Sequence, residues 1–243
     1  MRVNMTRWNL RAVIFDMDGV IIDSHPTHRR AWNEFLQTLG CQVSDHELDF
    51  ILEGRKRSDI LRHFLGDLPE PELAAYGEKK DEFFHRICPE VDPLPGVIDL
   101  IRNLETNDIC MAVATSGSRT RTRSTLDRLG VAHCFQVVVT GDDVPAGKPD
   151  PGMYQLACRQ LHVDPQQVVA IEDAASGIQA ATAAGICCIG VIGDGGSAQR
   201  LQAAGAKHLI DNFLGVGVEQ LNRILSTNMV VPNYNSANAP HFL

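Results

Sequence analysis

The feature that most constrains this chain is a predicted buried strand near its start that ends in two aspartates. Residues 13–20 read VIFDMDGV, so three apolar residues run directly into Asp16 and Asp18. Such a run is typical of a parallel strand, and open α/β sheets place their chemistry at the carboxyl ends of these strands. Since side chains alternate along an extended strand, both carboxylates would share one face. The pair suits a hard metal ion, covalent attack on phosphorus, acid–base chemistry or a plain aspartate-rich turn, and the segment alone leaves these open.

Size and composition narrow the class of protein. The 243 residues are 44% hydrophobic and 21% charged, as in an ordinary globular protein. The net charge of −8 argues against a general nucleic-acid or membrane-surface binder, so we expect neither partner. The seven cysteines show no disulfide framework, and no signal peptide or membrane span is predicted. We therefore expect a cytoplasmic protein, and a monomer.

The first strand is followed by a long stretch with helical character. Ala31, Trp32 and Phe35 begin an apolar pattern at helical spacing, and no strand is predicted between about His25 and Pro93. Further helices are predicted at about residues 45–52, 58–65 and 71–87. We therefore expect residues 24–93 to form a small, all-helical cap domain inserted after the first strand.

From Val97 onward, strands and helices alternate. Strands are predicted at residues 109–115, 135–140, 168–171, 186–192 and 207–210. Helices are predicted from Val97 to Leu104 and at residues 119–129, 150–161, 176–184 and 198–204. This alternation predicts an α/β fold with a doubly wound parallel sheet and right-handed crossovers. We expect the core to comprise residues 1–23 and 94–225, and residues 226–243 to form a loosely ordered tail.

Polar residues stand where several of these strands end. Thr115, Ser116 and Gly117 follow the second strand just before a helix, which offers a hydroxyl group and free backbone N–H groups to a phosphate. Because the carboxyl ends of parallel strands meet at one edge of a sheet, these residues should lie near the two aspartates.

A lysine and a second acidic pair follow later strands. Lys148 precedes a proline after the third strand, and Glu172 with Asp173 follows the fourth. Two acidic pairs, a hydroxyl-bearing turn and one lysine predict an anion site built around a divalent cation.

The order and type of these segments resemble the haloacid dehalogenase (HAD) superfamily, in particular its phosphatase and β-phosphoglucomutase branch with a helical cap. The resemblance covers about residues 12–213. It rests on four motifs, each after a predicted strand, at residues 16–20, 115–116, 148–149 and 172–173. Each motif alone is weak, whereas all four in this order are specific. The resemblance implies a Rossmann-like catalytic core.

The resemblance also implies roles for these residues. Asp16 would be the nucleophile that forms an aspartyl-phosphate, and Asp18 the general acid–base that protonates the leaving alkoxide and then activates water. Thr115, with the N–H groups of Ser116 and Gly117, would hold the phosphoryl oxygens.

The resemblance implies a magnesium site as well. Mg²⁺ would bind a carboxylate oxygen of Asp16, the backbone carbonyl of Asp18 and a carboxylate oxygen of Asp173, with Glu172 as a direct or water-bridged neighbour. Lys148 would neutralise Asp16 and the phosphate.

In the cap, the resemblance marks His28, Gly54, Arg57 and Lys80 as candidate substrate contacts. Residues 52–58 read LEGRKRS and depart from the Gly-Val-Ser-Arg pattern usual in the mutase, which weakens a mutase assignment. A solvated basic turn is an equally good interpretation of the cluster around Arg57. For Lys80, on a helix rich in charge, the pattern favours a surface position.

A further basic run contains Arg119, Arg121 and Arg123. On a helix Arg121 points away from the other two, so the pattern favours a solvated face over a nucleic-acid site.

The sequence therefore predicts a Mg²⁺-dependent phosphatase that hydrolyses a small phosphorylated metabolite, a sugar phosphate, through an aspartyl-phosphate. The first alternative is a β-phosphoglucomutase-type phosphohexomutase, which would return the phosphoryl group to a sugar hydroxyl. The second is a non-catalytic phosphometabolite-binding protein, which the presence of both aspartates, the lysine and the acidic pair disfavours.

Overall fold

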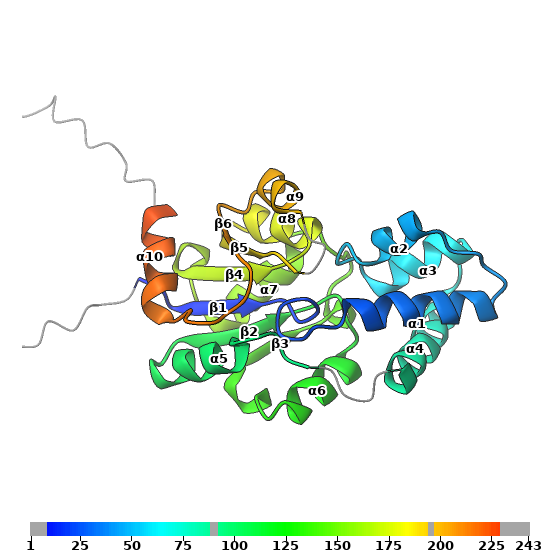
Figure 1. The fold of residues 1–243 in the computed structure, drawn as a ribbon, viewed down its shortest axis with the longest axis horizontal. Coiled ribbons are helices and arrows are strands. Elements are labelled where there is room, and N and C mark those ends of the chain that lie inside the picture. Colours follow the sequence, from blue (N-terminus) through cyan, green and yellow to red (C-terminus); the bar gives the residue numbers. More distant parts are fainter. Residues whose placement is uncertain (1–8, 88–91, 194–196, 229–243) are drawn as a thin grey trace, which may run out of the picture.

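A six-stranded parallel sheet forms the centre of the molecule, with strand order β3-β2-β1-β4-β5-β6 (Figure 1). The computed structural model describes residues 9–87, 92–193 and 197–228. The parallel strands in this order confirm the predicted doubly wound fold. The strands are β1 (Ala12–Phe15), β2 (Cys110–Ala114), β3 (Val137–Val139), β4 (Val168–Glu172), β5 (Cys187–Val191) and β6 (His208–Ile210).

Both faces of the sheet are buried because each is covered by helices. All residues of β1 are buried; Val13 and Phe15 belong to the apolar cluster on one face, and Ala12 and Ile14 to the cluster on the other. This explains why β1 is a continuous apolar run rather than an alternating one.

The core helices divide between the two faces. Helices α5 and α10 contribute to the cluster that contains Phe15, whereas α7 and α8 contribute to the cluster that contains Ile14. The core helices are α5 (Val97–Thr106), α6 (Arg119–Arg128), α7 (Gly152–Leu161), α8 (Ala175–Ala183), α9 (Ala198–Ala203) and α10 (Val218–Asn228). Short 3₁₀ helices lie at η1 (Ala132–Cys134), η2 (Gly141–Asp143) and η3 (Pro165–Gln167).

Helix α10 is a feature that the sequence analysis did not predict. It packs against the sheet through Val218, Leu221 and Leu225, and it continues to Asn228. The loosely ordered tail predicted from residue 226 is therefore wrong for its first three residues. The rest of that tail, residues 229–243, lies outside the described part of the chain.

Four helices between β1 and α5 form the cap, which lies beyond the carboxyl end of the sheet (Figure 1). They bury a separate apolar cluster around Phe35, Leu36 and Leu61. The cap helices are α1 (His25–Thr38), α2 (Asp45–Ile51), α3 (Arg57–Leu65) and α4 (Glu70–Ile87). The cap thus has its own hydrophobic core, in agreement with the all-helical insertion predicted from the sequence.

The chain enters and leaves the cap through two neighbouring segments. The N–H of Asp23 donates to the carbonyl of Asp92 at 2.9 Å, and the N–H of Leu94 donates to the carbonyl of Ile21 at 3.0 Å. These paired connections fix the cap directly above the end of β1.

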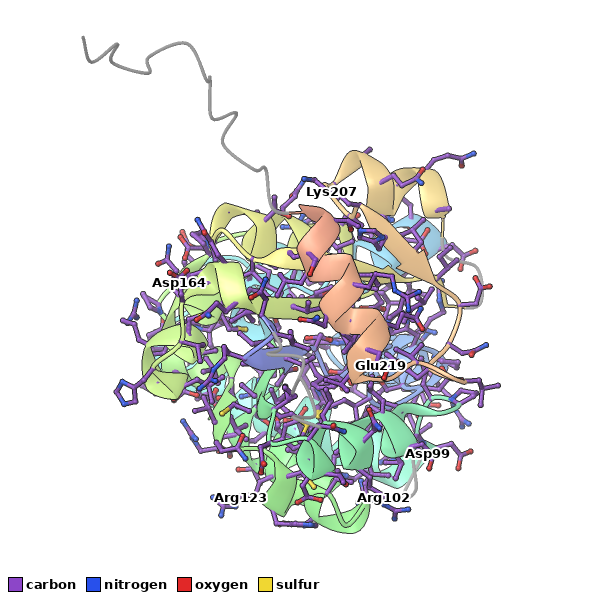
Figure 2. The ribbon with its side chains drawn as sticks, turned by 90° about the vertical axis from the view of Figure 1, so that its left-hand side faces the viewer. Asp99, Arg102, Arg123, Asp164, Lys207 and Glu219 are labelled. Carbon is purple, nitrogen blue, oxygen red and sulfur yellow. The ribbon has the colours of Figure 1, made fainter. Side chains whose placement is uncertain are left out.

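The opposite end of the molecule carries no part of the cap. Figure 2 views the molecule from that end and shows exposed charged side chains of both signs, including Lys207 and Glu219. Among the described helices, none combines the length with the apolar character needed to cross a bilayer.

The cap cluster provides a stability prediction. Phe35 is 1% exposed, and its ring packs edge-on against Trp32, Tyr76 and Phe83. Phe35→Ala should therefore lower the free energy of unfolding by about 3–5 kcal/mol, measured by urea unfolding followed by tryptophan fluorescence. The matched control Leu214→Ala, at a side chain that is 67% exposed, should change it by less than about 0.5 kcal/mol. Equal effects of the two variants would contradict a packed cap core.

Candidate active site

The register of the sheet brings the predicted motifs together. Phe15 pairs with Val113 on one side and with Ile171 on the other, so the residues after β1, β2 and β4 emerge side by side. The N–H of Asp16 donates to the carbonyl of Ile171 at 2.9 Å, which continues the strand pairing as far as the first aspartate.

Three carboxylates and one ammonium group form the floor of the site. Oxygens of Asp16, Glu172 and Asp173 lie within 4.8 Å of one another. The Lys148 ammonium donates to Asp16 at 2.6 Å and to Glu172 at 2.5 Å. Tyr154 donates its hydroxyl hydrogen to Glu172 at 2.6 Å. All four of the predicted floor residues therefore lie in one cluster.

The electrostatics of this cluster favour a further cation. Burial, together with the nearby carboxylates of Glu172 and Asp173, raises the pKa of Asp16 well above its usual range, although Lys148 opposes this. Asp16 and Glu172 hold the pKa of Lys148 above its usual range despite burial. Lys148 and the nearby His25 supply at most two positive charges beside three carboxylates, and oxygen donors of this kind are those that Mg²⁺ prefers. The donor set thus fits a magnesium ion.

His25 is a member of this cluster that the sequence analysis missed. Its Nε2 lies 2.9 Å from Asp173 Oδ2, and this contact raises the pKa of His25 to about 9 against the opposing effect of burial. Gly19, with φ of +75°, makes room for the pair, since a Cβ there would lie 2.0 Å from the same oxygen. The sequence around His25, at the start of α1, contains no pattern that indicates this contact with Asp173.

The turn after β2 lies beside Asp16. Thr115 is 1% exposed, and its Oγ1 accepts the N–H of Gly117 at 3.1 Å. Ser116 instead donates its hydroxyl hydrogen to the carbonyl of Gly54 in the cap at 2.6 Å. The turn predicted to hold a phosphate therefore follows β2 at the edge of the cavity, and it also forms a direct contact between core and cap.

Asp18 points toward the cap, where four hydrogen bonds hold its carboxylate. Arg121 donates to both oxygens, at 2.9 and 2.5 Å, and Ser24 donates at 2.6 Å. His28 Nε2 lies 3.1 Å from the same carboxylate. Burial alone would raise the pKa of Asp18, but Arg121 and His28 together hold it well below the usual range. Asp18 is therefore ionised in this arrangement.

Arg121 is the most important site residue that the sequence analysis missed. The prediction that it lies on a solvated face is wrong, since its side chain is 2% exposed, although it does point away from Arg119 and Arg123. Gly117 makes room for it, because a Cβ at Gly117 would lie 2.4 Å from the guanidinium. Helical periodicity within one segment cannot reveal a partner more than 100 residues away.

His28 and Lys80 meet beneath the cap helices. The Lys80 ammonium lies 2.9 Å from His28 Nδ1, so a neutral imidazole accepts from Lys80 and donates to Asp18. Burial and the positive charge of Lys80 lower the pKa of His28 to about 3. Burial also lowers the pKa of Lys80 to about 7. The predicted surface position of Lys80 is wrong: it is 2% exposed because α4 turns this side chain toward α1.

Arg57 and Gly54 complete the cap side. Arg57 donates to Asp81 at 2.6 Å, and Ser118 of the core donates to the same carboxylate oxygen at 2.7 Å. Gly54, with φ of +72°, lies above Lys148, since a Cβ there would be 3.8 Å from the lysine chain. Asp81 carried no motif in the sequence, and only the packing of α3 against α4 reveals its role.

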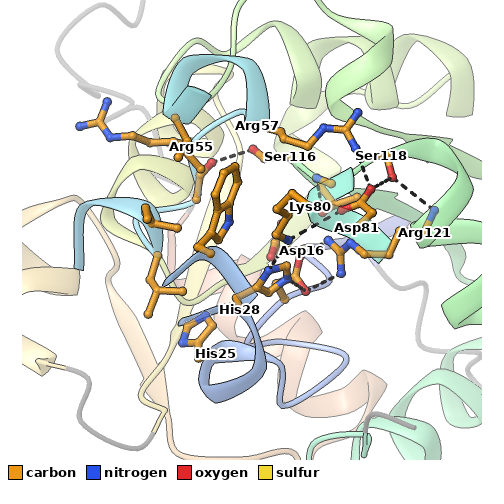
Figure 3. Close-up of a pocket in the computed structure, with 18 of the residues that line it drawn as sticks. Asp16, His25, His28, Arg55, Arg57, Lys80, Asp81, Ser116, Ser118 and Arg121 are labelled. Carbon is orange, nitrogen blue, oxygen red and sulfur yellow. Dashed lines mark hydrogen bonds and ion pairs between the residues drawn. The ribbon is translucent and has the colours of Figure 1, made fainter. Parts of the chain in front are cut away.

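Most of these residues line one cavity between cap and core, with a volume of about 80 Å³ (Figure 3). Asp16, Asp18 and Asp173 line the core side, and Trp32 and Ile60 contribute apolar walls on the cap side. The carboxylates of Asp16 and Glu172 on the floor of the site are buried, and low exposure to water strengthens the charge interactions between such groups.

Comparison with known proteins assigns the family. Residues 13–191 match the family described as haloacid dehalogenase-like hydrolase. Protein CbbY of Cereibacter sphaeroides is 34% identical over 220 residues, covering 86% of this chain and 94% of that protein. Fructose-1-phosphate phosphatase YqaB of Escherichia coli (strain K12) is 37% identical over 183 residues, covering 74% and 95%. The crystal structure of β-phosphoglucomutase from Clostridium difficile matches with a TM-score of 0.79 at 25% identity, covering 90% and 98%.

The family match extends over most of the chain, and the fold and the order of the motifs agree with it. The chain belongs to the haloacid dehalogenase-like hydrolases, in their β-phosphoglucomutase-like branch with a helical cap.

Proposed function

We propose that this chain is a Mg²⁺-dependent phosphatase that hydrolyses a sugar phosphate through an aspartyl-phosphate on Asp16. The observation that carries the proposal is the buried contact of Asp16 with Lys148 at the end of β1, beside two further carboxylates. A carboxylate can approach a phosphate dianion only where cations offset the repulsion. Lys148 is one such cation, and the neighbouring carboxylates would bind a second, the magnesium ion.

The reaction follows from the positions of the two aspartates. Asp16 attacks phosphorus through a carboxylate oxygen, the bond from phosphorus to the sugar oxygen breaks, and Asp18 gives its proton to that oxygen. Asp18 must first take up a proton, since Arg121 holds it ionised before the substrate binds. Asp18 then removes a proton from water, which attacks the aspartyl-phosphate and releases inorganic phosphate.

The phosphate and metal would share the core residues. Thr115 and the N–H groups of Ser116 and Gly117 would hold phosphoryl oxygens, with Lys148 as their counter-charge. Asp16, Asp173 and the backbone carbonyl of Asp18 would hold Mg²⁺, with Glu172 as a neighbour. The ion would neutralise charge on the phosphoryl group.

Support for a sugar phosphate comes from the relatives and the cavity. A fructose-1-phosphate phosphatase and a β-phosphoglucomutase are both similar to this chain, and their names refer to phosphorylated sugars. The cavity combines Trp32, which suits an apolar ring face, with polar groups of His28 and Lys80 that suit hydroxyls. A cytoplasmic location and a monomeric state stay predictions from the sequence.

Asp16→Asn tests the nucleophile. Since an amide cannot form the acyl-phosphate, phosphate release from fructose 1-phosphate should fall by more than about 10³-fold, with an unchanged circular dichroism spectrum. The matched control Asp23→Asn alters an exposed aspartate outside the cavity and should retain normal activity. Near-normal turnover by Asp16→Asn would rule out the nucleophile assignment.

Metal removal tests the carboxylate floor. EDTA should stop phosphate release and Mg²⁺ should restore it. Mg²⁺ should also raise the Tm by calorimetry, since binding at a hundredfold excess over Kd stabilises by about 2.7 kcal/mol. Because protons compete for Asp16, whose pKa is raised, this shift in Tm should be larger at pH 8 than at pH 5.

Asp173→Asn should reduce the Mg²⁺-induced shift in Tm, whereas Asp23→Asn should not. Turnover that persists in EDTA, or an equal shift in Tm for both variants, would contradict the proposed site.

The mutase alternative is tested by the fate of the phosphoryl group. The protein is incubated with β-glucose 1-phosphate and a trace of glucose 1,6-bisphosphate, and the products are identified by ³¹P NMR. We expect inorganic phosphate. Glucose 6-phosphate as the product would instead establish the mutase. If neither forms, a panel of other sugar phosphates should release phosphate. Phosphate release from none of them would favour the non-catalytic binding protein.

A further inference from the structure

The cap side of the cavity carries one carboxylate, Asp81, in the middle of three cationic side chains. Arg57 Nη1 lies 2.6 Å from Asp81 Oδ2, and Lys80 Nζ lies 3.7 Å from Oδ1. Arg121 of the core also contributes to holding the pKa of Asp81 below its usual range against the effect of burial. Figure 3 shows Asp81 at the centre of this group.

The Arg57–Asp81 pair is supported by its surroundings. Gly77 lies inside helix α4, where glycine is unfavourable relative to alanine. A Cβ at Gly77 would lie 2.3 Å from Arg57 Nε, so only glycine lets the arginine lie flat against the helix. Gly77 and Asp81 are four residues apart and share one face of α4. The helix therefore provides both the space for Arg57 and its counter-ion.

The pair also joins cap to core. Ser118 donates its hydroxyl hydrogen to Asp81 Oδ2 at 2.7 Å, the same oxygen that Arg57 contacts. The side chains of Arg57 and Asp81 are only 20% and 15% exposed. Separating such a pair takes the nearest cation away from a poorly hydrated carboxylate, which is costly even with Lys80 3.7 Å away. Arg57 therefore stays paired with Asp81 in this arrangement of cap and core.

The remaining arginine on the cap side is occupied as well. Arg55 contacts Glu53 at 3.3 Å and lies over the ring of Phe50, and Figure 3 shows its guanidinium pointing away from the other labelled side chains. Among the described cavity-lining residues of the cap, both arginines thus have a carboxylate partner. A second phosphate group arriving at the cap side would find its cations engaged and Asp81 opposing it.

We propose that Asp81, by engaging Arg57, is a specificity-determining residue that restricts this site to substrates with one phosphate group and an uncharged remainder. The inference rests on the proposed phosphatase function and names its substrate class. Bisphosphates are disfavoured because binding their second phosphate requires Arg57 to leave Asp81.

The test compares fructose 1-phosphate with fructose 1,6-bisphosphate as competitive inhibitors of p-nitrophenyl phosphate hydrolysis. The wild type should bind the monophosphate at least tenfold more tightly. Asp81→Asn should lower this preference at least tenfold. The change should come mainly from tighter binding of the bisphosphate, because Arg57 is released from Asp81. The matched control Asp142→Asn removes another carboxylate, 4.0 Å from Arg57 and outside the cavity lining, and should keep the preference within twofold.

Two further variants test whether the change in preference depends on Arg57. Asp81→Asn combined with Arg57→Gln should lose the gained bisphosphate affinity; a gain that persists would overturn the role of Arg57. If Asp81→Asn does not fold, Gly77→Ala, which crowds Arg57 away from α4, should also tighten the binding of the bisphosphate, by a smaller factor because the Asp81 carboxylate stays in place. A preference unchanged in whichever of these two variants folds, or a wild type that binds both compounds equally, would overturn the proposal.

A binding measurement separates this inference from the proposed function. Calorimetric titration of fructose 1,6-bisphosphate into Asp16→Asn and into Asp16→Asn combined with Asp81→Asn requires no turnover. At least tenfold tighter binding to the double variant supports the inference even if the wild type hydrolyses nothing, in which case only the phosphatase proposal fails. Equal binding with an active wild type overturns the inference alone.

Discussion

The structure depends on one electrostatic constraint, the gathering of acidic groups at the carboxyl end of a buried parallel sheet. Asp16, Glu172 and Asp173 approach one another where water is largely excluded, and the Lys148 ammonium bridges two of them. The repulsion among these carboxylates is tolerable only with cations present, and this charge balance is the basis of the proposed magnesium site. The sheet supplies the rigidity that holds such like charges together.

The contacts between cap and core are mostly polar. Ser116 donates to the Gly54 carbonyl, Ser118 donates to Asp81, and Lys56 donates to the Val144 carbonyl at 2.7 Å. The apolar side chains of the cap instead pack against one another in the cluster around Phe35. Water can replace hydrogen bonds between neutral groups of this kind at small net cost, so the cap's stability comes mainly from its own apolar cluster.

The local pattern predicted most of the architecture. The expected strand at residues 109–115 contains β2, and the expected strand at 168–171 lies within β4, because buried strands are short apolar runs with abrupt polar ends. Predictions failed where position depended on distant partners. Lys80 and Arg121 look like surface residues within their own helices, yet each is buried against a polar side chain far away in the chain. Helix α10 was missed although Leu221 and Leu225 face the sheet.

The sequence by itself determined the fold class and the core motifs, since apolar runs that end in Asp16, Thr115 and Glu172 can be recognised one strand at a time. Only the tertiary structure decided how the charges of the cap are shared. The partner of Arg57 lies on another helix and the partner of Arg121 lies in the turn after β1, and hydrogen bonds between side chains depend on distances that no local spacing encodes. Whether a cation is free to bind substrate is therefore settled by packing, because burial and an available carboxylate determine its partner.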